Sequence, residues 1–94
     1  MSIAADFNPT FEDHLRHMLG AGSHYRKSQW GFRNHFLAEV GTKHHDDMLE
    51  MVKLGLVEAG GFINRDQDQY FRATLLGCQK IELHKAAIKR AFER

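Results

Sequence analysis

The sequence lacks the features that hold together small secreted proteins or anchor proteins in membranes. Its single cysteine, Cys78, cannot form an intramolecular disulfide, which excludes a disulfide framework and fits a reducing compartment. No stretch approaches the roughly 20 apolar residues of a membrane span, and the first residues show no basic-then-apolar secretory signal. With one proline and 43% hydrophobic residues, the composition is globular rather than disordered. We therefore expect a soluble, cytoplasmic protein with no membrane partner.

A large excess of one charge is also missing. Lys and Arg total 13 against 12 Asp and Glu, so the formal net charge is +1 at pH 7. A protein that coats nucleic acid without specificity normally has a strong basic excess, which this chain does not have. The 94 residues suffice for one core. We expect a flexible N-terminal lead over residues 1–7 and a single domain over residues 8–94.

The sequence contains no recognisable catalytic or metal-binding pattern. Gly20 and Gly22 follow a predicted helix rather than a strand, so they do not form a phosphate-binding loop. No nucleophile, base and orienting group can be assigned together. A structural zinc site usually needs four ligands with paired cysteines, and the adjacent side chains of His44 and His45 point apart. We expect no enzymatic activity, no metal site and no cofactor.

Helix-start and helix-stop signals divide the chain into four predicted helices. Asn8 and Pro9 mark the start of the first, and Gly20 marks its end. Gly41 and Gly55 follow the second and third, and Thr74 is a plausible N-cap for the fourth. The predicted helices cover residues 9–19, 29–40, 45–54 and 75–92. Residues 56–63 and 69–74 have the composition of two strands, with residues 64–68 as the connecting tip.

The order of three helices, a strand, a polar tip, a strand and a final helix resembles a winged helix-turn-helix domain. Residues 49–77 are similar to the C-terminal half of multiple-resistance-regulator-type domains. In that family the recognition helix runs into a Gly-Leu-Val signature, which is Gly55-Leu56-Val57 here, and the hairpin closes near Thr74 and Gly77. The expected fold class is therefore α+β and mainly α, a small winged-helix domain of about four helices with one β-hairpin.

A second resemblance involves the segments LRHMLG, FRNHF, LGLVE and YFRATLLG, in this order. They are similar to segments of small uncharacterised proteins encoded by tailed phages and prophages. The resemblance implies a phage origin, and hence the cytoplasm of a bacterial host cell, but it implies no activity.

The resemblance to winged-helix domains implies DNA as the first candidate partner. Wing arginines can reach phosphates or a narrow minor groove, and aromatics interleaved with arginines can stack on bases. On this interpretation the chain is a non-enzymatic regulatory or accessory protein. The candidate DNA-binding residues are Arg26, Lys27, Arg33, Lys43, Arg65 and Arg72.

The third predicted helix argues against direct reading of DNA. It presents Asp46, Asp47 and Glu50 with only Lys53 to balance them, whereas reading helices favour cationic and amide side chains. These four residues could instead form a protein-binding face, or simply a solvated one. The alternative function is thus an interaction module that docks this acidic helix, or the C-terminal helix, on a host or phage protein. A homodimer through the C-terminal helix is also expected, because Ile81, Ile88 and Phe92 have little core to cover them.

Overall fold

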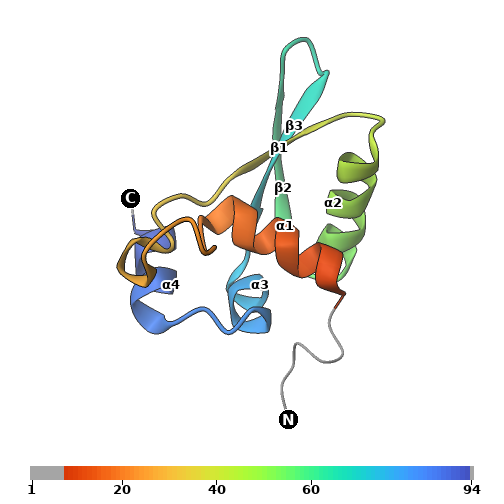
Figure 1. Ribbon diagram of the computed structural model, residues 1–94. Helices are drawn as coiled ribbons and strands as arrows, with labels where there is room; N and C mark the ends of the chain where they lie inside the picture. The colour runs from red at the N-terminus through yellow and green to blue at the C-terminus, as the bar shows by residue number, and fades with distance from the viewer. Residues whose placement is uncertain (1–7, 94) are drawn as a thin grey trace.

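The computed structural model describes residues 8–93, so the flexible lead predicted for residues 1–7 lies outside the described residues. Within them the chain forms an α+β domain of four α-helices, a short 3-10 helix and one antiparallel sheet (Figure 1). The sheet has the order β1-β3-β2, so the last strand in sequence is the central one. The elements are α1 (Pro9–Leu19), η2 (Lys27–Gln29), β1 (Phe36–Glu39), α2 (Lys43–Lys53), β2 (Val57–Ile63), β3 (Asp68–Ala73), α3 (Leu75–Lys80) and α4 (Lys85–Phe92).

The first helix forms where its capping signals predicted. Asn8 accepts a hydrogen bond from the Thr10 amide, and Pro9 occupies the first helical position. Gly20 ends the helix in the left-handed conformation, with φ of 66°. Leu15, which belongs to the predicted apolar stripe, is fully buried, so α1 contributes one side of the core.

The prediction of a helix over residues 29–40 is wrong. The structure has the 3-10 turn η2 at its start and strand β1 at its end, and β1 pairs with β3 through Phe36 opposite Phe71. Alternate burial along β1 explains how Phe36 and Ala38 reach the core. One helix, α2, therefore lies between β1 and β2. The helix predicted between α1 and α2 is therefore absent from the described residues 8–93, where η2 and β1 take its place.

The third helix and the hairpin are confirmed. Thr42 caps α2 through the His45 amide, and Gly55, with φ of 77°, follows the end of the helix. Strands β2 and β3 pair antiparallel, and their ladder has a β-bulge between Ala59 and Phe62. The connecting turn runs from residue 64 to residue 67, and three of its residues have positive φ.

The last predicted helix is divided into two. A turn at residues 81–84 separates α3 from α4, and Glu82 adopts a left-handed conformation with φ of 56°. Thr74 caps α3 by accepting a hydrogen bond from the Gly77 amide, as its position predicted. Because of the turn, α4 does not continue along α3 but lies at the opposite side of the molecule from α2 (Figure 1).

A single hydrophobic core joins these elements. It collects side chains from every helix and strand except η2, and its largest fully buried members include Phe71, Met48 and Met51. Ile81 is buried and Ile88 is packed against the core, so the surface proposed for a homodimer retains only Phe92, which is 46% exposed. Across residues 8–93 no helix combines the length and apolar character needed to cross a bilayer.

Candidate nucleic-acid interface

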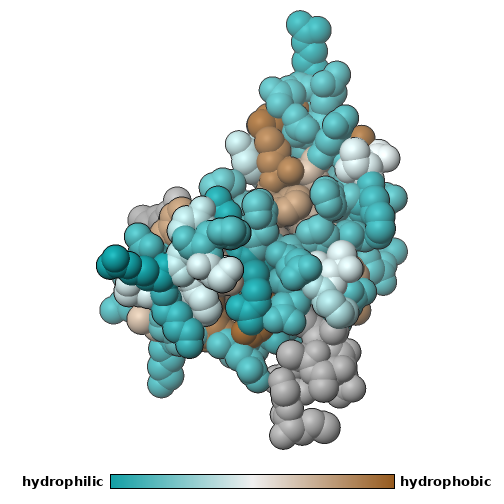
Figure 2. All heavy atoms as spheres, viewed as in Figure 1, coloured by the Kyte–Doolittle hydropathy of each residue, from teal (hydrophilic) through white to brown (hydrophobic). Residues whose placement is uncertain are grey.

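Cationic side chains gather where the C-terminal end of α1, the loop with η2, and α4 meet. Residues 14–38 contain four Lys or Arg residues and no Asp or Glu, and helix α4 packs on η2. In Figure 2 hydrophilic residues cover most of this end of the molecule. We refer to this surface as the basic end, which comprises Arg16, Arg26, Lys27, Arg33, Lys85, Lys89 and Arg90.

A glycine allows α4 to lie directly on the loop. Gly31 has φ of 84°, and a Cβ atom at this position would lie 2.1 Å from the carbonyl oxygen of Ala87. Arg90 adds a hydrogen bond of 2.5 Å from Nη1 to the Trp30 carbonyl oxygen. The ring of Trp30 lies 6.2 Å from that of His84, which precedes α4. These contacts bring the cations of α4 beside those of the loop.

Hydrogen bonds also fix the loop itself. The indole Nε1 of Trp30 donates to the carbonyl oxygens of Gly22 and Tyr25, at 3.1 and 3.2 Å. Arg33 donates through Nε and Nη2 to the carbonyl oxygen of His17, at 3.1 and 2.7 Å, in the last turn of α1. A cation at a helix C-terminus is favourable because the helix dipole is negative there. Arg33 is therefore fixed in position while its charge remains at the surface.

Two aromatic rings stand beside these cations. Tyr25 and Phe32 have ring centroids 4.9 Å apart and are 38% and 42% exposed. The guanidinium of Arg33 lies 5.8 Å from the Tyr25 centroid and 5.3 Å from that of Phe32. Lys27 lies 5.7 Å from the Trp30 ring in a similar cation–π contact. Aromatic and cationic groups thus alternate over the basic end.

Two open pockets adjoin Tyr25. The first, the aromatic pocket, has a volume of about 340 Å³ and is lined by Tyr25, Ser28, Gln29, Phe32 and Arg90. The second, the cationic pocket, has a volume of about 330 Å³ and lies at the C-terminal end of α1. Its lining residues are Arg16, His17, Gly20, Gly22, His24, Tyr25 and Arg33.

Two carboxylates balance part of the positive charge of the basic end. Glu12 accepts a hydrogen bond of 2.9 Å from Nε of Arg16, and Glu93 lies 3.8 Å from Lys89. Arg16 also donates to the backbone oxygens of Ala21 and Ile81. Both carboxylates lie outside the acid-free run of residues 14–38.

The structure separates the other three predicted DNA-binding residues from this surface. Arg65 lies in the turn of the hairpin, with φ of 58°. Arg72 on β3 forms an ion pair of 3.2 Å with Glu58 on β2. Lys43, in the first turn of α2, is 83% exposed and lies 3.1 Å from Asp47. The six predicted residues therefore do not form one face, and three of them, Arg26, Lys27 and Arg33, lie together.

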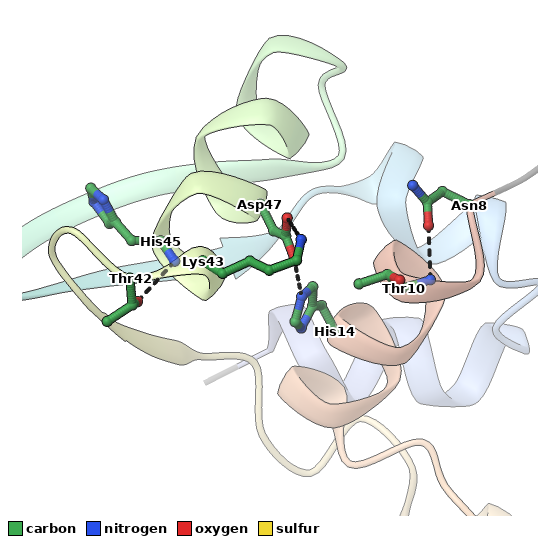
Figure 3. A network of polar contacts seen from close by, with 7 residues as sticks. All are labelled: Asn8, Thr10, His14, Thr42, Lys43, His45 and Asp47. Carbon is green, nitrogen blue, oxygen red and sulfur yellow. Dashed lines mark hydrogen bonds and ion pairs between the residues drawn. The ribbon is translucent and has the colours of Figure 1, made fainter.

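The acidic face predicted on the third helix is smaller than the sequence suggests. Asp47 turns toward α1 and accepts a hydrogen bond of 3.0 Å from Nε2 of His14, while Lys43 bonds its other oxygen (Figure 3). The Asp47 side chain is only 13% exposed. Asp46 and Glu50 remain at the surface, and Lys53 lies 4.0 Å from Glu50. Asp47 thus joins two helices, and little of its side chain remains at the surface.

Burial and neighbouring charges alter two pKa values near this junction. Burial raises the pKa of Asp47, but the hydrogen bonds from His14 and Lys43 outweigh that effect, so the net pKa is lowered. The pKa of His17 is lowered by burial and by the positive charges of Arg33 and of the neighbouring histidines. Both effects favour the neutral form of His17 and the ionised form of Asp47.

The remaining sites of interest in the sequence have structural explanations. His45 is buried and its Nε2 lies 2.9 Å from the Gln69 Oε1, whose amide in turn donates to the Gly60 carbonyl. Burial raises the pKa of Cys78 to about 11, so its thiol is protonated at neutral pH. Among the described residues no three His, Cys, Asp or Glu side chains converge in a way that could hold a metal ion.

The sequence-based prediction missed Arg16, Lys85, Lys89 and Arg90. One signal was available, because the absence of acidic residues from 14 to 38 is visible in the sequence and includes Arg16. The cations of α4 could not be assigned in this way. The position of α4 beside the loop depends on the contact of Gly31 with Ala87, two residues far apart in the sequence.

Comparisons with models of protein families, with curated proteins and with solved structures give no match. The charges, rings and pockets of the basic end are therefore the features of this chain that indicate a function.

Proposed function

We propose that this chain is a non-enzymatic accessory or regulatory protein, of a winged-helix-like and phage type, that binds nucleic acid through its basic end. The observation that carries the proposal is the acid-free run of residues 14–38, onto which α4 adds three more cations. Nucleic-acid affinity depends mainly on phosphate neutralisation, and a surface with several cations and few carboxylates supplies it. The formal net charge of +1 hides this surface, because acids elsewhere balance it.

Three cations of the basic end are suited to phosphate contacts. Arg26 and Lys27 are exposed on the loop, and Lys89 is exposed on the helix packed against it. In the winged-helix-like description, the hairpin would be the wing and α2 the reading helix. In this chain α2 exposes Asp46 and Glu50, which repel phosphates. The proposal therefore assigns the phosphate contacts to the basic end and not to the reading helix.

The salt dependence of binding tests this assignment. The affinity for a labelled DNA duplex and for a single strand is measured by fluorescence anisotropy at several salt concentrations. Arg26→Ala should weaken binding and reduce the salt slope by about one, because one phosphate contact is lost. Arg65→Ala is the matched control at the tip of the hairpin, and it should leave both quantities close to those of the parent. The opposite result would return the phosphate contacts to the wing.

One observation favours a second candidate, a protein-interaction module. Leu54 directly precedes Gly55, and Leu76 lies 3.6 Å from the Cβ position of that glycine; the two leucines are 52% and 42% exposed, and Leu75 is 52% exposed. Together with Asp46 and Glu50 on the same helix as Leu54, they form an apolar and acidic surface that suits a basic protein partner. If the parent binds no oligonucleotide at low salt, and Leu54→Asp abolishes the capture of a basic protein that Arg26→Ala retains, this candidate replaces the first.

A further inference from the structure

We propose that the two pockets beside Tyr25 form a site for unpaired nucleotides, with a base in the aromatic pocket and the adjoining phosphate in the cationic pocket. The inference rests on the proposed function, and it deepens it by naming single-stranded nucleic acid as the ligand. Tyr25 lines both pockets, so a base and its own phosphate can occupy them at the same time.

The aromatic pocket has the groups that an unstacked base needs. Tyr25 and Phe32 provide exposed ring surface, on which a base can stack regardless of its identity. Ser28 and Gln29 line the same pocket and supply donors and acceptors for the polar edge of a base. Its volume of about 340 Å³ lies within the range typical of small-molecule sites.

The cationic pocket supplies charge for the phosphate. Arg33 and Arg16 line it, and its lining residues include no carboxylate, although Arg16 shares its charge with Glu12 outside the pocket. His17 and His24 add imidazole nitrogen atoms that can bond a phosphate oxygen. Arg33 lies over the rings of Tyr25 and Phe32 and also lines this pocket, so one guanidinium connects the stacking surface to the phosphate site. Gly20 and Gly22 complete the lining, and nothing lies within 4 Å of the Cβ position of Gly22, so its backbone is open to a ligand.

The site is held in shape before any ligand binds. A Cβ atom at Gly20 would lie 2.2 Å from Cε1 of Phe32, so the ring sits directly against the end of α1. The bonds from Trp30 to the Gly22 and Tyr25 carbonyl oxygens fix the other side of the loop. A prearranged site loses less conformational entropy on binding, which favours affinity.

Paired bases cannot use this site in the same way. The faces of bases in a duplex are covered by their neighbours, so stacking on Tyr25 and Phe32 requires an unpaired base. The basic end would still attract the phosphates of a duplex through Arg26 and Lys27. The site therefore predicts that a single strand binds more tightly than a duplex with the same number of phosphates.

The test compares an oligothymidylate of about 12 nucleotides with a duplex carrying the same number of phosphates, at one salt concentration. The parent should bind the single strand about tenfold more tightly than the duplex. Tyr25→Leu should remove about that tenfold preference, while affinity for the duplex changes little. Tyr70→Leu is the control, because Tyr70 is 39% exposed against 38% for Tyr25 and lies on β3, away from both pockets.

Two further measurements keep the result interpretable. Tyr25→Trp retains an aromatic face, so it should preserve the preference for the single strand even if Tyr25→Leu alters the loop. Circular dichroism confirms that each variant is folded. Equal affinity of the parent for the two ligands, or equal losses in Tyr25→Leu and Tyr70→Leu, overturns the nucleotide site and leaves the proposed function standing. Binding of neither ligand at low salt overturns both.

Discussion

The two sides of this small domain carry opposite charges. Residues 14–38, on the side of η2 and α4, have four Lys or Arg residues and no acid, whereas residues 39–68, which include α2 and β2, have seven acids and three cations. Both segments pack on one core, and Figure 1 shows α2 and α4 at opposite sides of it. The exposed charges of α2 and the hairpin therefore differ in sign from those of the loop and α4. The distribution of charge over the fold decides which side can approach phosphates.

The largest expected effect comes from separating α4 from the loop. Gly31→Ala places a Cβ atom against the Ala87 carbonyl oxygen at a left-handed φ of 84°. We expect a loss of about 3 kcal/mol in the free energy of unfolding, from backbone strain and overpacking together. Urea denaturation measures it. Gly22→Ala is the control, because nothing lies within 4 Å of its Cβ position and its φ is not in the left-handed region. Equal losses in the two variants would show that the contact with α4 does not hold this side together.

A smaller loss of unfolding free energy is expected from breaking the contact between α1 and α2 at His14 and Asp47. Asp47→Asn weakens the bonds to His14 and Lys43 and should cost about 1–2 kcal/mol of unfolding free energy at neutral pH. The lowered pKa of Asp47 adds a pH dependence. Its stabilisation is complete above the unfolded value of 3.8 and is lost as pH falls through the folded pKa. In Asp47→Asn that acid-side loss should be reduced, whereas Asp46→Asn, at an exposed position, should behave like the parent.

Neutralising the exposed acids of α2 should change nucleic-acid affinity little. The double variant Asp46→Asn/Glu50→Gln removes repulsion at long range, so we expect a gain of about twofold and an unchanged salt slope, because no phosphate contact is added. Anisotropy titrations at several salt concentrations measure both quantities. A gain of tenfold or more would place the ligand against α2 and would contradict the assignment to the basic end.

The smallest expected effect is a pH dependence at the end of α1. Because the folded pKa of His17 lies below its ordinary value of 6.5, the unfolded chain binds the proton more readily. Unfolding free energy should therefore decrease as pH falls below about 6.5 and level off below the folded pKa. His17→Gln should flatten this slope in thermal or urea unfolding between pH 7 and pH 5. The control is His24→Gln, which replaces an exposed histidine and keeps His17, so the slope should remain.

Local signals in the sequence predicted the elements whose ends depend on caps. Asn8 begins α1 because its side chain accepts a hydrogen bond from a backbone amide of the first turn. Gly20 ends α1, and Gly55 separates α2 from the hairpin, because both glycines adopt the left-handed conformation. The final helix was predicted as continuous because no Gly or Pro marks its break. The turn there is formed by Glu82 in a left-handed conformation, which its residue type does not indicate.

Long-range pairing explains the other failure. Phe32, Phe36 and Val40 recur at helical spacing, but Phe36 and Ala38 also fit the alternation of a short strand. The strand is selected by pairing with β3 and by Asn34, whose side chain bonds both backbone groups of Ala73. For the candidate site, Arg26, Lys27 and Arg33 were predicted and lie together. The contribution of α4 was not, since it depends on a contact between distant parts of the chain.

The β-bulge between Ala59 and Phe62 also affects the tendency of this protein to aggregate at high concentration. Strand β2 is an edge of the sheet, and an uninterrupted edge of seven residues would present backbone groups on which another chain could add a strand. The bulge interrupts the regular spacing of those groups, and the other edge, β1, has only four residues. Both edges are thus poor templates for ordered aggregation, which keeps an exposed hairpin compatible with a monodisperse solution.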